Sequence, residues 1–213
     1  MIKSVKRLGA AVLSAVIMLT AVATPLGDKL PVVGERVADV ASAETYGDFQ
    51  YSVLDDGTVE ITKYIGSAEK VDIPEKIDGK SVTSIGSSVF RGCKRLSSIT
   101  IPNCVTSIDS FAFRDCTSLK SITIPNSVTS IYYDAFRGCT SLTAINVANR
   151  NQNYVSVNGV LYDKDKTVII RYPAGKKDKS YSILDGVTGI CAYAFEDCAN
   201  LESITLPDSV TLM

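Results

Sequence analysis

Histidine is absent from this chain of 213 residues, as is tryptophan. Without histidine the chain can form neither a Ser-His nor a Cys-His nucleophile pair, and zinc sites with histidine ligands are excluded as well. The sequence also lacks the glycine-rich phosphate loops of standard spacing and any C-x-x-C pair. We therefore expect no catalytic residues, no metal site and no cofactor.

Long apolar runs are missing too. The longest, Leu8–Ala23, has 16 residues, fewer than the ~20 that a membrane-spanning helix needs, and it follows three basic residues. This layout predicts a secretory signal peptide. Small-x-small sequences end at Ala23 and at Ala43, so cleavage after either residue fits, and we assign residues 1–43 to signal peptide and leader. The mature chain is then expected to have no membrane span.

An excess of positive charge is also lacking. Residues 1–43 carry five basic and three acidic residues, so residues 44–213 carry 17 Lys and Arg against 20 Asp and Glu, a net charge of −3. A nucleic-acid-binding protein needs a basic face to displace counterions from phosphates. This composition therefore argues against a nucleic-acid partner.

What the sequence does contain is repetition. Each copy has 23 residues and reads V-T-x-I-x-x-x-[VA]-F-x-x-C-x-x-L-x-x-I-x-[IVL], usually followed by Pro. The four copies are Val82–Cys104, Val105–Ser127, Val128–Arg150 and, after an interruption, Val187–Ser209. A repeat this short cannot bury its own apolar face and must stack on its neighbours. Residues 82–213 are therefore predicted to form a solenoid.

Each part of the repeat has a predicted structure. The segment L-x-x-I-x-[IVL] alternates apolar and polar residues, which predicts one strand per copy in a parallel sheet. The segment V-T-x-I predicts a second short strand, and x-A-F-x-x-C a turn or a short helical turn. Equivalent side chains of stacked turns should form ladders through the core. The heaviest ladder is that of Phe90, Phe113, Phe136 and Phe195.

The regions outside the copies are predicted to be hairpins. Alternating runs at Phe49–Val53 and Thr58–Thr62 flank Asp-Gly, which is typical of a β-hairpin. With the partial first repeat that follows, this hairpin makes residues 44–81 an N-terminal cap. The interruption, at about 151–183, reads as a hairpin that projects from one turn of the solenoid.

The repeat resembles a known family. Val105–Pro125, VTSIDSFAFRDCTSLKSITIP, is similar almost throughout to the leucine-rich repeat of BspA-like bacterial surface proteins. The resemblance implies an α/β repeat solenoid: a right-handed leucine-rich superhelix with a parallel β-sheet and few or short helices. It also implies export, frequent surface attachment and a role in adhesion or protein recognition. It offers no catalytic residues to carry over.

The outward strand positions form the candidate binding surface. They hold small polar side chains, which suit any exposed strand but would also make a flat docking face for an extended protein or glycan. These positions are Ser98, Thr100, Ser121, Thr123, Asn146, Ser203 and Thr205. Tyrosine is enriched in interfaces, so exposed tyrosines are candidate anchors. We select Tyr132, Tyr133, Tyr154 and Tyr162.

Cysteine recurs at one repeat position, so the four equivalent thiols should stack as a ladder. They are Cys93, Cys116, Cys139 and Cys198. We interpret them as small apolar core residues, although stacked turns in an exported chain also bring disulfides within reach. Cys104 and Cys191 lie outside the ladder and are expected to be more exposed.

Two functions fit these features best, and a purely structural spacer is a third interpretation. The first is an exported, non-enzymatic recognition or adhesion module, secreted or on a bacterial cell surface, which binds a host or bacterial surface partner through its solenoid surface. The alternative is a targeting or scaffold region of a longer secreted enzyme, truncated at Met213. Val210-Thr211 opens a further copy that is not completed. The resulting apolar edge predicts end-to-end self-association.

Overall fold

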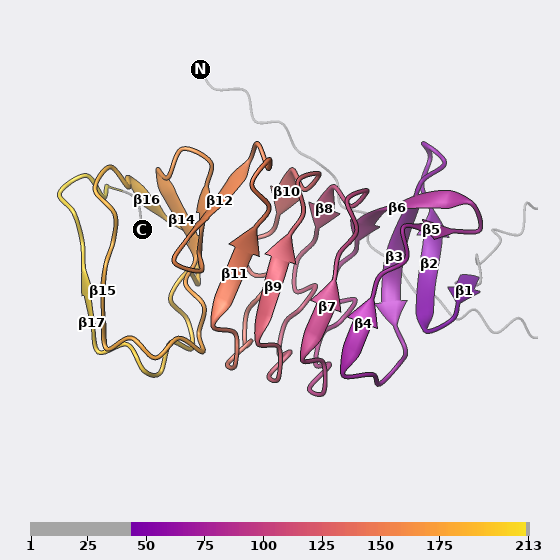
Figure 1. Cartoon of the computed structure of the whole chain (residues 1–213), viewed down its shortest axis with the longest axis horizontal. Helices are drawn as coiled ribbons and strands as arrows, with labels where there is room; N and C mark the ends of the chain where they lie inside the picture. Colours follow the sequence, from indigo (N-terminus) through magenta and orange to yellow (C-terminus); the bar gives the residue numbers. More distant parts are fainter. Residues whose placement is uncertain (1–43, 212–213) are drawn as a thin grey trace, which may run out of the picture. The chain divides into compact units, whose positions relative to one another are not determined.

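The structure is a computed structural model that describes residues 44–211 (Figure 1). The predicted signal peptide and leader, residues 1–43, lie outside the described residues. Within residues 44–211 all regular secondary structure is β-strand. No helix that is long and apolar enough to cross a membrane occurs among these residues.

The alternating segments form a first row of parallel strands, as predicted. Its members are β4 (Lys70–Asp72), β7 (Ser98–Thr100), β9 (Ser121–Ile124), β11 (Ala144–Val147), β15 (Ser180–Ser182) and β17 (Ser203–Thr205). Hydrogen-bonded pairs within the row are β4 with β7, β9 with β11, and β15 with β17. Equivalent residues face each other, as Ile122 faces Ile145. Because side chains alternate along a strand, these isoleucines point into the core while their neighbours face solvent.

The V-T-x-I segments form a second row, also as predicted. It contains β6 (Lys80–Ile85), β8 (Ser107–Ile108), β10 (Ser130–Ile131), β14 (Val168–Arg171) and β16 (Gly189–Ile190). Strands β6, β8 and β10 pair in parallel, and so do β14 and β16. Figure 1 shows the two rows on opposite sides of the stacked turns.

The segments around x-A-F-x-x-C are turns, so within residues 44–211 the expected short helices and the α/β class are wrong and the fold is a β-solenoid. Some of their backbone N–H groups bond within the segment, as Cys93 N does to Phe90 O (3.0 Å), and others bond to the next turn. Phe90 N donates to Ala112 O (2.8 Å), and Phe113 N donates to Ala135 O (2.9 Å). The residue before each ladder cysteine has positive φ, which Gly and Asp tolerate best. These residues are Gly92, Asp115, Gly138 and Asp197.

The phenylalanine ladder is present in the three consecutive copies. The Phe90 and Phe113 rings stack at 5.2 Å with an interplanar angle of 3°, and Phe113 and Phe136 stack at 5.6 Å and 6°. All three rings are buried. Tyr64 continues the stack at the N-terminal end, 5.2 Å from Phe90. A tyrosine therefore fills the Phe position in a turn that lacks the repeat signature.

The predicted N-terminal hairpin is confirmed. Its strands are β2 (Phe49–Val53) and β3 (Val59–Tyr64), preceded by β1 (Glu44–Tyr46). The β2 and β3 strands pair antiparallel, and β3 also pairs in parallel with β6 of the second row. A second hairpin joins β5 (Lys76–Ile77) to β6 through Asp78 and Gly79. The sheet of the second row therefore continues into the N-terminal hairpin.

The interruption is folded into the stack. Strands β12 (Tyr154–Val157) and β13 (Val160–Asp163) form an antiparallel sheet with β14. A projecting hairpin was the wrong expectation, because the residues of β13 pack inward and Leu161 and Tyr162 are fully buried. The insertion divides the core into two clusters, and Phe195 lies in the second. The ladder therefore stops at Phe136, and Phe195 stacks on Tyr172 at 5.5 Å.

Candidate functional site

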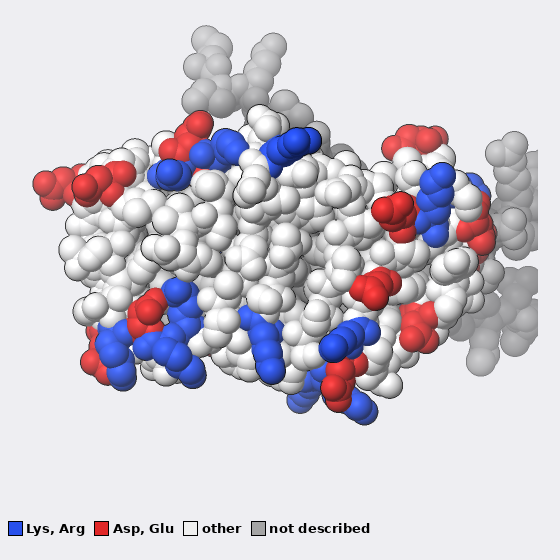
Figure 2. All heavy atoms as spheres, viewed as in Figure 1, with Lys and Arg blue, Asp and Glu red and all other residues white. Residues whose placement is uncertain are grey.

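The outward positions of β7, β9 and β11 form what we call the serine–threonine face. All of its side chains are exposed, and they come from three consecutive turns. The face consists of Ser98, Thr100, Ser121, Thr123 and Asn146. Figure 2 shows this side of the molecule: Lys, Arg, Asp and Glu gather along two edges, and the band over these strands is largely uncharged. The array is therefore uncharged and polar.

Ser203 and Thr205 are exposed but do not belong to this face. They lie on β17, which pairs with β15 and not with β11. The hairpin of β12 and β13 lies against β11, where Ile145 N donates to Gly159 O (2.8 Å) and Ser156 Oγ donates to Ile145 O (2.6 Å). The predicted surface is thus split into two parts by the insertion.

Tyr132 and Tyr133 lie elsewhere, directly after β10 in the second row. Beside them is a hollow of about 460 Å³, which we call the tyrosine cleft. Its walls are tyrosines and its other lining residues are mainly apolar. They are Ser130, Ile131, Tyr132, Tyr133, Tyr154, Asp163, Val168, Ile170 and Cys191. The predicted anchors Tyr132, Tyr133 and Tyr154 therefore share one site, on a different row from the serine–threonine face.

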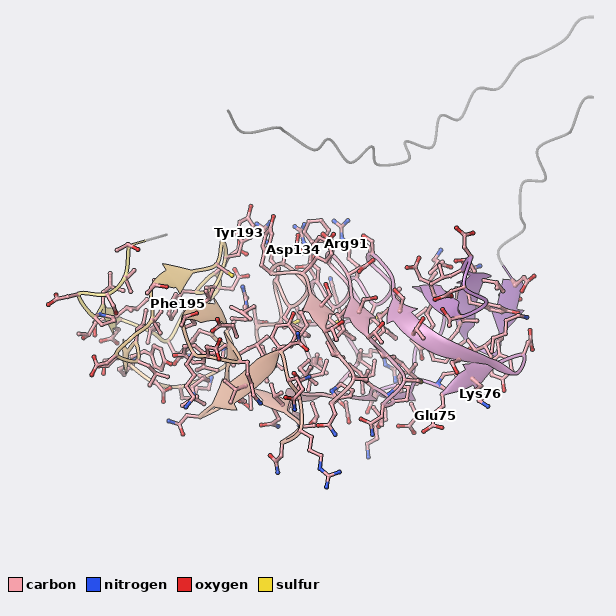
Figure 3. The ribbon with its side chains drawn as sticks, turned by 90° about the horizontal axis from the view of Figure 1, so that it is seen from above. Glu75, Lys76, Arg91, Asp134, Tyr193 and Phe195 are labelled. Carbon is pink, nitrogen blue, oxygen red and sulfur yellow. The ribbon has the colours of Figure 1, made fainter. Side chains whose placement is uncertain are left out.

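The rim of the cleft exposes large aromatic surfaces. Tyr132 is 50% exposed and Tyr133 is 46% exposed. The Tyr133 ring stacks on Tyr193, which is 45% exposed, with 6.1 Å between the ring centroids. Figure 3 shows Tyr193 on the same side of the molecule as Asp134, the residue that follows Tyr133. Exposed aromatic rings that cluster in this way are typical of interaction sites.

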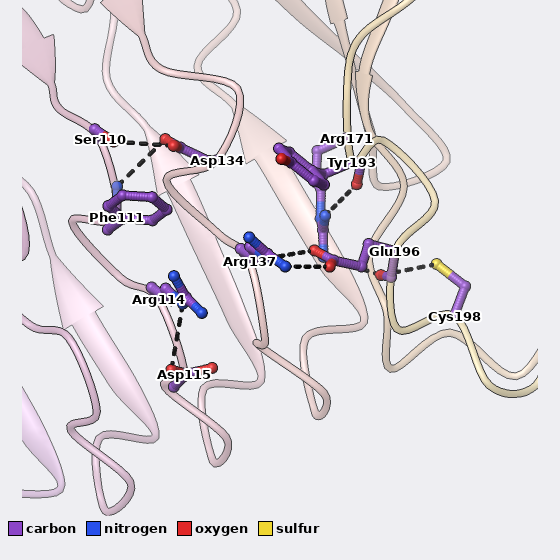
Figure 4. Close-up of polar contacts among 10 residues, drawn as sticks. All are labelled: Ser110, Phe111, Arg114, Asp115, Asp134, Arg137, Arg171, Tyr193, Glu196 and Cys198. Atoms are coloured by element: carbon purple, nitrogen blue, oxygen red, sulfur yellow. Dashed lines mark hydrogen bonds and ion pairs between the residues drawn. The ribbon is translucent and has the colours of Figure 1, made fainter.

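An ion-pair network supports Tyr193 from below (Figure 4). Arg137 binds the Glu196 carboxylate through two contacts of 2.7 Å, and its guanidinium lies 4.5 Å from the centre of the Tyr193 ring. Buried Arg171 donates to the carbonyl oxygens of Tyr193 and Glu196. Paired charged groups and a cation–π contact hold the ring in place.

The repeat pattern does not predict the roles of two residues in this region, Tyr193 and Asn151. Tyr193 occupies a variable repeat position, and only its proximity to Tyr133 marks it. Asn151 is fully buried, and its side chain accepts hydrogen bonds from the N–H groups of Asn153 and Tyr154, both at 2.8 Å. Asn151 therefore fixes the start of β12 and the position of Tyr154. An Asn in a polar loop gives no sequence signal of such a role.

One predicted anchor is wrong. Tyr162 has no exposed surface, because β13 lies between β12 and β14 and turns this side chain into the second core cluster. Its hydroxyl lies 2.5 Å from that of Tyr181. Burial, with this hydrogen bond, raises the pKa of Tyr162 well above its usual range. Tyr162 is thus a core residue and contacts no ligand from this position.

The six cysteines are free in the structure. Cys116 and Cys139 are buried, and their thiols donate to Phe90 O and Phe113 O, both at 3.0 Å. Cys93 and Cys198, the outer ladder positions, are half-buried, and so are the two cysteines outside the ladder. Burial raises the pKa of the Cys198 thiol to about 11. Thiols with raised pKa stay protonated at neutral pH and act as small apolar side chains.

Two rows of short parallel strands, with equivalent side chains stacked between them, define a leucine-rich repeat solenoid. The chain belongs to the BspA-type leucine-rich repeat family, whose model matches residues 63–160 and 174–213 in six copies. The unmatched residues in between lie in the insertion. No curated protein matches the chain significantly.

Solved structures of bacterial leucine-rich repeat proteins are similar to this chain. One from Bacteroides ovatus ATCC 8483 has 30% identity and a TM-score of 0.56, and the match covers 79% of this chain and 42% of that one. The pneumococcal vaccine antigen PcpA has 21% identity and a TM-score of 0.50, with 80% and 66% covered. One from Eubacterium ventriosum ATCC 27560 has 24% identity and a TM-score of 0.46, with 78% and 60% covered. The chain thus spans between 42% and 66% of the length of these proteins.

Proposed function

We propose that this chain is an exported, non-enzymatic recognition module that binds a protein on a host or bacterial surface through its solenoid surface. The observation that carries the proposal is the serine–threonine face. Its side chains are short, so little conformational entropy is lost when a partner covers them. Each is held by a strand whose inward neighbours are packed in the core, which makes the face rigid before binding.

Export is the second part of the proposal, and its support comes from the N-terminal sequence. The basic start, the uncharged run of 16 residues and the two small-x-small sequences fit a secretory signal. Membership in a family of leucine-rich repeat proteins agrees with this assignment. A secreted or cell-surface location would expose the serine–threonine face to external partners.

The proposal also assigns the N-terminal hairpin of β2 and β3 the role of a cap on a right-handed superhelix. The inward residues Val59 and Ile61 of β3 are fully buried, and β3 pairs with β6. Solenoids need terminal segments that cover the apolar end of the stack. A cap of this kind would keep the first turns rigid and so preserve the geometry of the serine–threonine face.

A substitution at the centre of the face tests the proposal. We expect Thr123→Arg to leave the melting temperature nearly unchanged, because the side chain is exposed, and to abolish capture of the partner, because a long charged side chain would stand in a neutral interface. The wild-type chain is used to capture partners from host extracellular matrix and from bacterial cell-wall extracts. The captured protein is then purified and titrated with each variant.

Thr106→Arg is the matched control, since Thr106 is also exposed but precedes β8 in the other row. It should bind the partner as the wild type does. Equal affinity of the Thr123→Arg variant and the wild type would remove the serine–threonine face as the binding surface.

A further inference from the structure

The sheet formed by the first strands of the second row ends at β10, which leaves one edge of this strand without a neighbouring strand among the described residues. Its other edge pairs with β8. In the two preceding turns the carbonyl of the equivalent isoleucine accepts a hydrogen bond from the next turn: Ile85 O from Asp109 N (2.9 Å), and Ile108 O from Tyr132 N (3.0 Å). The insertion replaces the strand that would continue this ladder beside Ile131.

A tyrosine side chain occupies part of this open edge. The Tyr154 hydroxyl accepts a hydrogen bond from Ile131 N (2.9 Å) and lies 3.4 Å from Thr129 O. One phenol group thus makes two of the contacts that a further strand would make along this edge. Exposed strand edges are sites where extended segments of other proteins add to a sheet.

The lining of the cleft defines the chemistry of its ligand. Ile131, Val168 and Ile170 give it apolar surface, and Tyr132 and Tyr133 form an aromatic rim. These groups suit apolar and aromatic side chains of a peptide.

Among the described residues, Asp163 is the one carboxylate that lines the cleft, and its oxygens already accept hydrogen bonds. Asp163 accepts hydrogen bonds from Thr167 N (2.7 Å), Val168 N (2.8 Å) and Thr167 Oγ1 (2.6 Å). No other charged residue and no amide side chain lines the cleft among the described residues. A neutral ligand is therefore favoured, and beyond Asp163 the lining offers a saccharide no charged or amide partner for its hydroxyl groups.

We propose that the tyrosine cleft binds an extended, uncharged segment of a partner protein, which adds as a strand to the open edge of β10 and packs its side chains against Tyr132 and Tyr133. The inference rests on the proposed recognition function but uses a different surface from the serine–threonine face. The ligand's backbone would bond to Ile131, and its alternate side chains would enter the cleft.

The chain itself supplies a suitable probe. Residues 127–133, Ser-Val-Thr-Ser-Ile-Tyr-Tyr, are uncharged and contain β10, the strand that adds to β8. A peptide of this sequence with blocked ends reproduces β10, the strand that the edge of β8 accepts in the structure. Titration of the full chain with this peptide, followed by calorimetry, should show saturable binding. A blocked Gly-Ser peptide of equal length should not bind.

Three substitutions in the full chain separate strand addition from other modes of binding. Tyr133→Ala and Tyr132→Ala should each weaken binding at least 10-fold, because each removes one ring of the rim. Tyr154→Phe should strengthen binding several-fold, because it frees Ile131 N–H for the peptide backbone while keeping the ring. Tyr46→Ala is the control: Tyr46 is similarly exposed but lies on β1, and its loss should change nothing.

Several results would overturn the inference: no saturable binding of the peptide, binding that is unchanged in both the Tyr132 and Tyr133 variants, or binding that Tyr154→Phe leaves equal or weaker. Binding of maltotetraose in place of the peptide would show a saccharide site and would overturn it too. Unchanged circular dichroism spectra confirm that each variant is folded. Partner capture that fails with Thr123→Arg, together with absence of peptide binding, would refute only this inference and leave the proposed function intact.

Discussion

Phe113→Ala is expected to lower the free energy of unfolding by about 3–5 kcal/mol, the range found for large-to-small changes in packed cores. Phe113 is fully buried and stacks on Phe90 on one side and on Phe136 on the other. Its loss removes two ring–ring contacts and leaves a cavity that the neighbouring turns cannot fill, because the ladder hydrogen bonds fix their spacing. Urea denaturation monitored by circular dichroism measures the change.

Phe111→Ala is the matched control in the same turn. Phe111 is only half-buried and contacts the Arg114 guanidinium at its surface, 5.0 Å from the ring centre. Its substitution should cost no more than about 1 kcal/mol, as for most partly exposed positions. Equal losses for Phe111→Ala and Phe113→Ala would mean that the phenylalanine stack is not the main source of stability.

Asn151→Ala is expected to cost about 2–4 kcal/mol, although Asn151 is a single polar residue outside the repeats. Its Nδ2 donates to Pro125 O (2.7 Å) and to Val128 O (3.0 Å), and its Oδ1 accepts from two backbone N–H groups. Alanine would remove all four hydrogen bonds. Pro125 O would keep Val128 N as a donor (3.4 Å), but Val128 O and the two N–H groups would lose the Asn151 side chain as their partner, each at a cost of about 1 kcal/mol or more. Thermal and urea denaturation both measure the loss.

The control for this change is Asn126→Ala. Asn126 is exposed, and its side chain accepts one hydrogen bond, from Arg150 N (3.0 Å), in the same part of the chain. Water can replace that bond, so the expected loss is below about 1 kcal/mol. If Asn151→Ala were no more destabilising than Asn126→Ala, Asn151 could not be the residue that anchors the insertion to the solenoid.

The repeat pattern predicts the core of the consecutive copies well. Val105, Ile108, Leu119 and Ile124 stand at the positions selected from periodicity, and all are buried. These predictions succeed because stacking places equivalent residues in equivalent surroundings. One copy therefore describes its neighbours wherever another turn covers it.

Prediction from the repeat pattern fails where a turn lacks equivalent neighbours. Ile204 and Leu206 of the fourth copy are 39% and 45% exposed, because within the described residues no further turn packs on them. The insertion has no counterpart in the other copies, so its burial could not be inferred from them. For this reason Tyr162 was wrongly predicted to be exposed. An alternating run of residues does not show whether its strand is enclosed by other strands.

The sequence indicates which residues of the candidate site are exposed, but it does not indicate which of them lie together on one surface. The exposure of Ser121 and Thr123 follows from strand alternation, which a sequence displays. The separation of Thr205 from them, and the approach of Tyr193 to Tyr133, depend on how the insertion displaces the last turns. Contacts between residues so far apart in sequence arise from tertiary packing, which no local pattern encodes.

The insertion divides the core into two clusters, and this division affects how the solenoid unfolds. In a stack where each layer touches only its neighbours, cooperativity is no stronger than the weakest interface. Phe195 and Leu201 are half-buried in the smaller cluster, whereas Phe113 lies in the middle of the larger one. Amide protons of the last turns should thus exchange with solvent through partial unfolding that leaves the central turns intact.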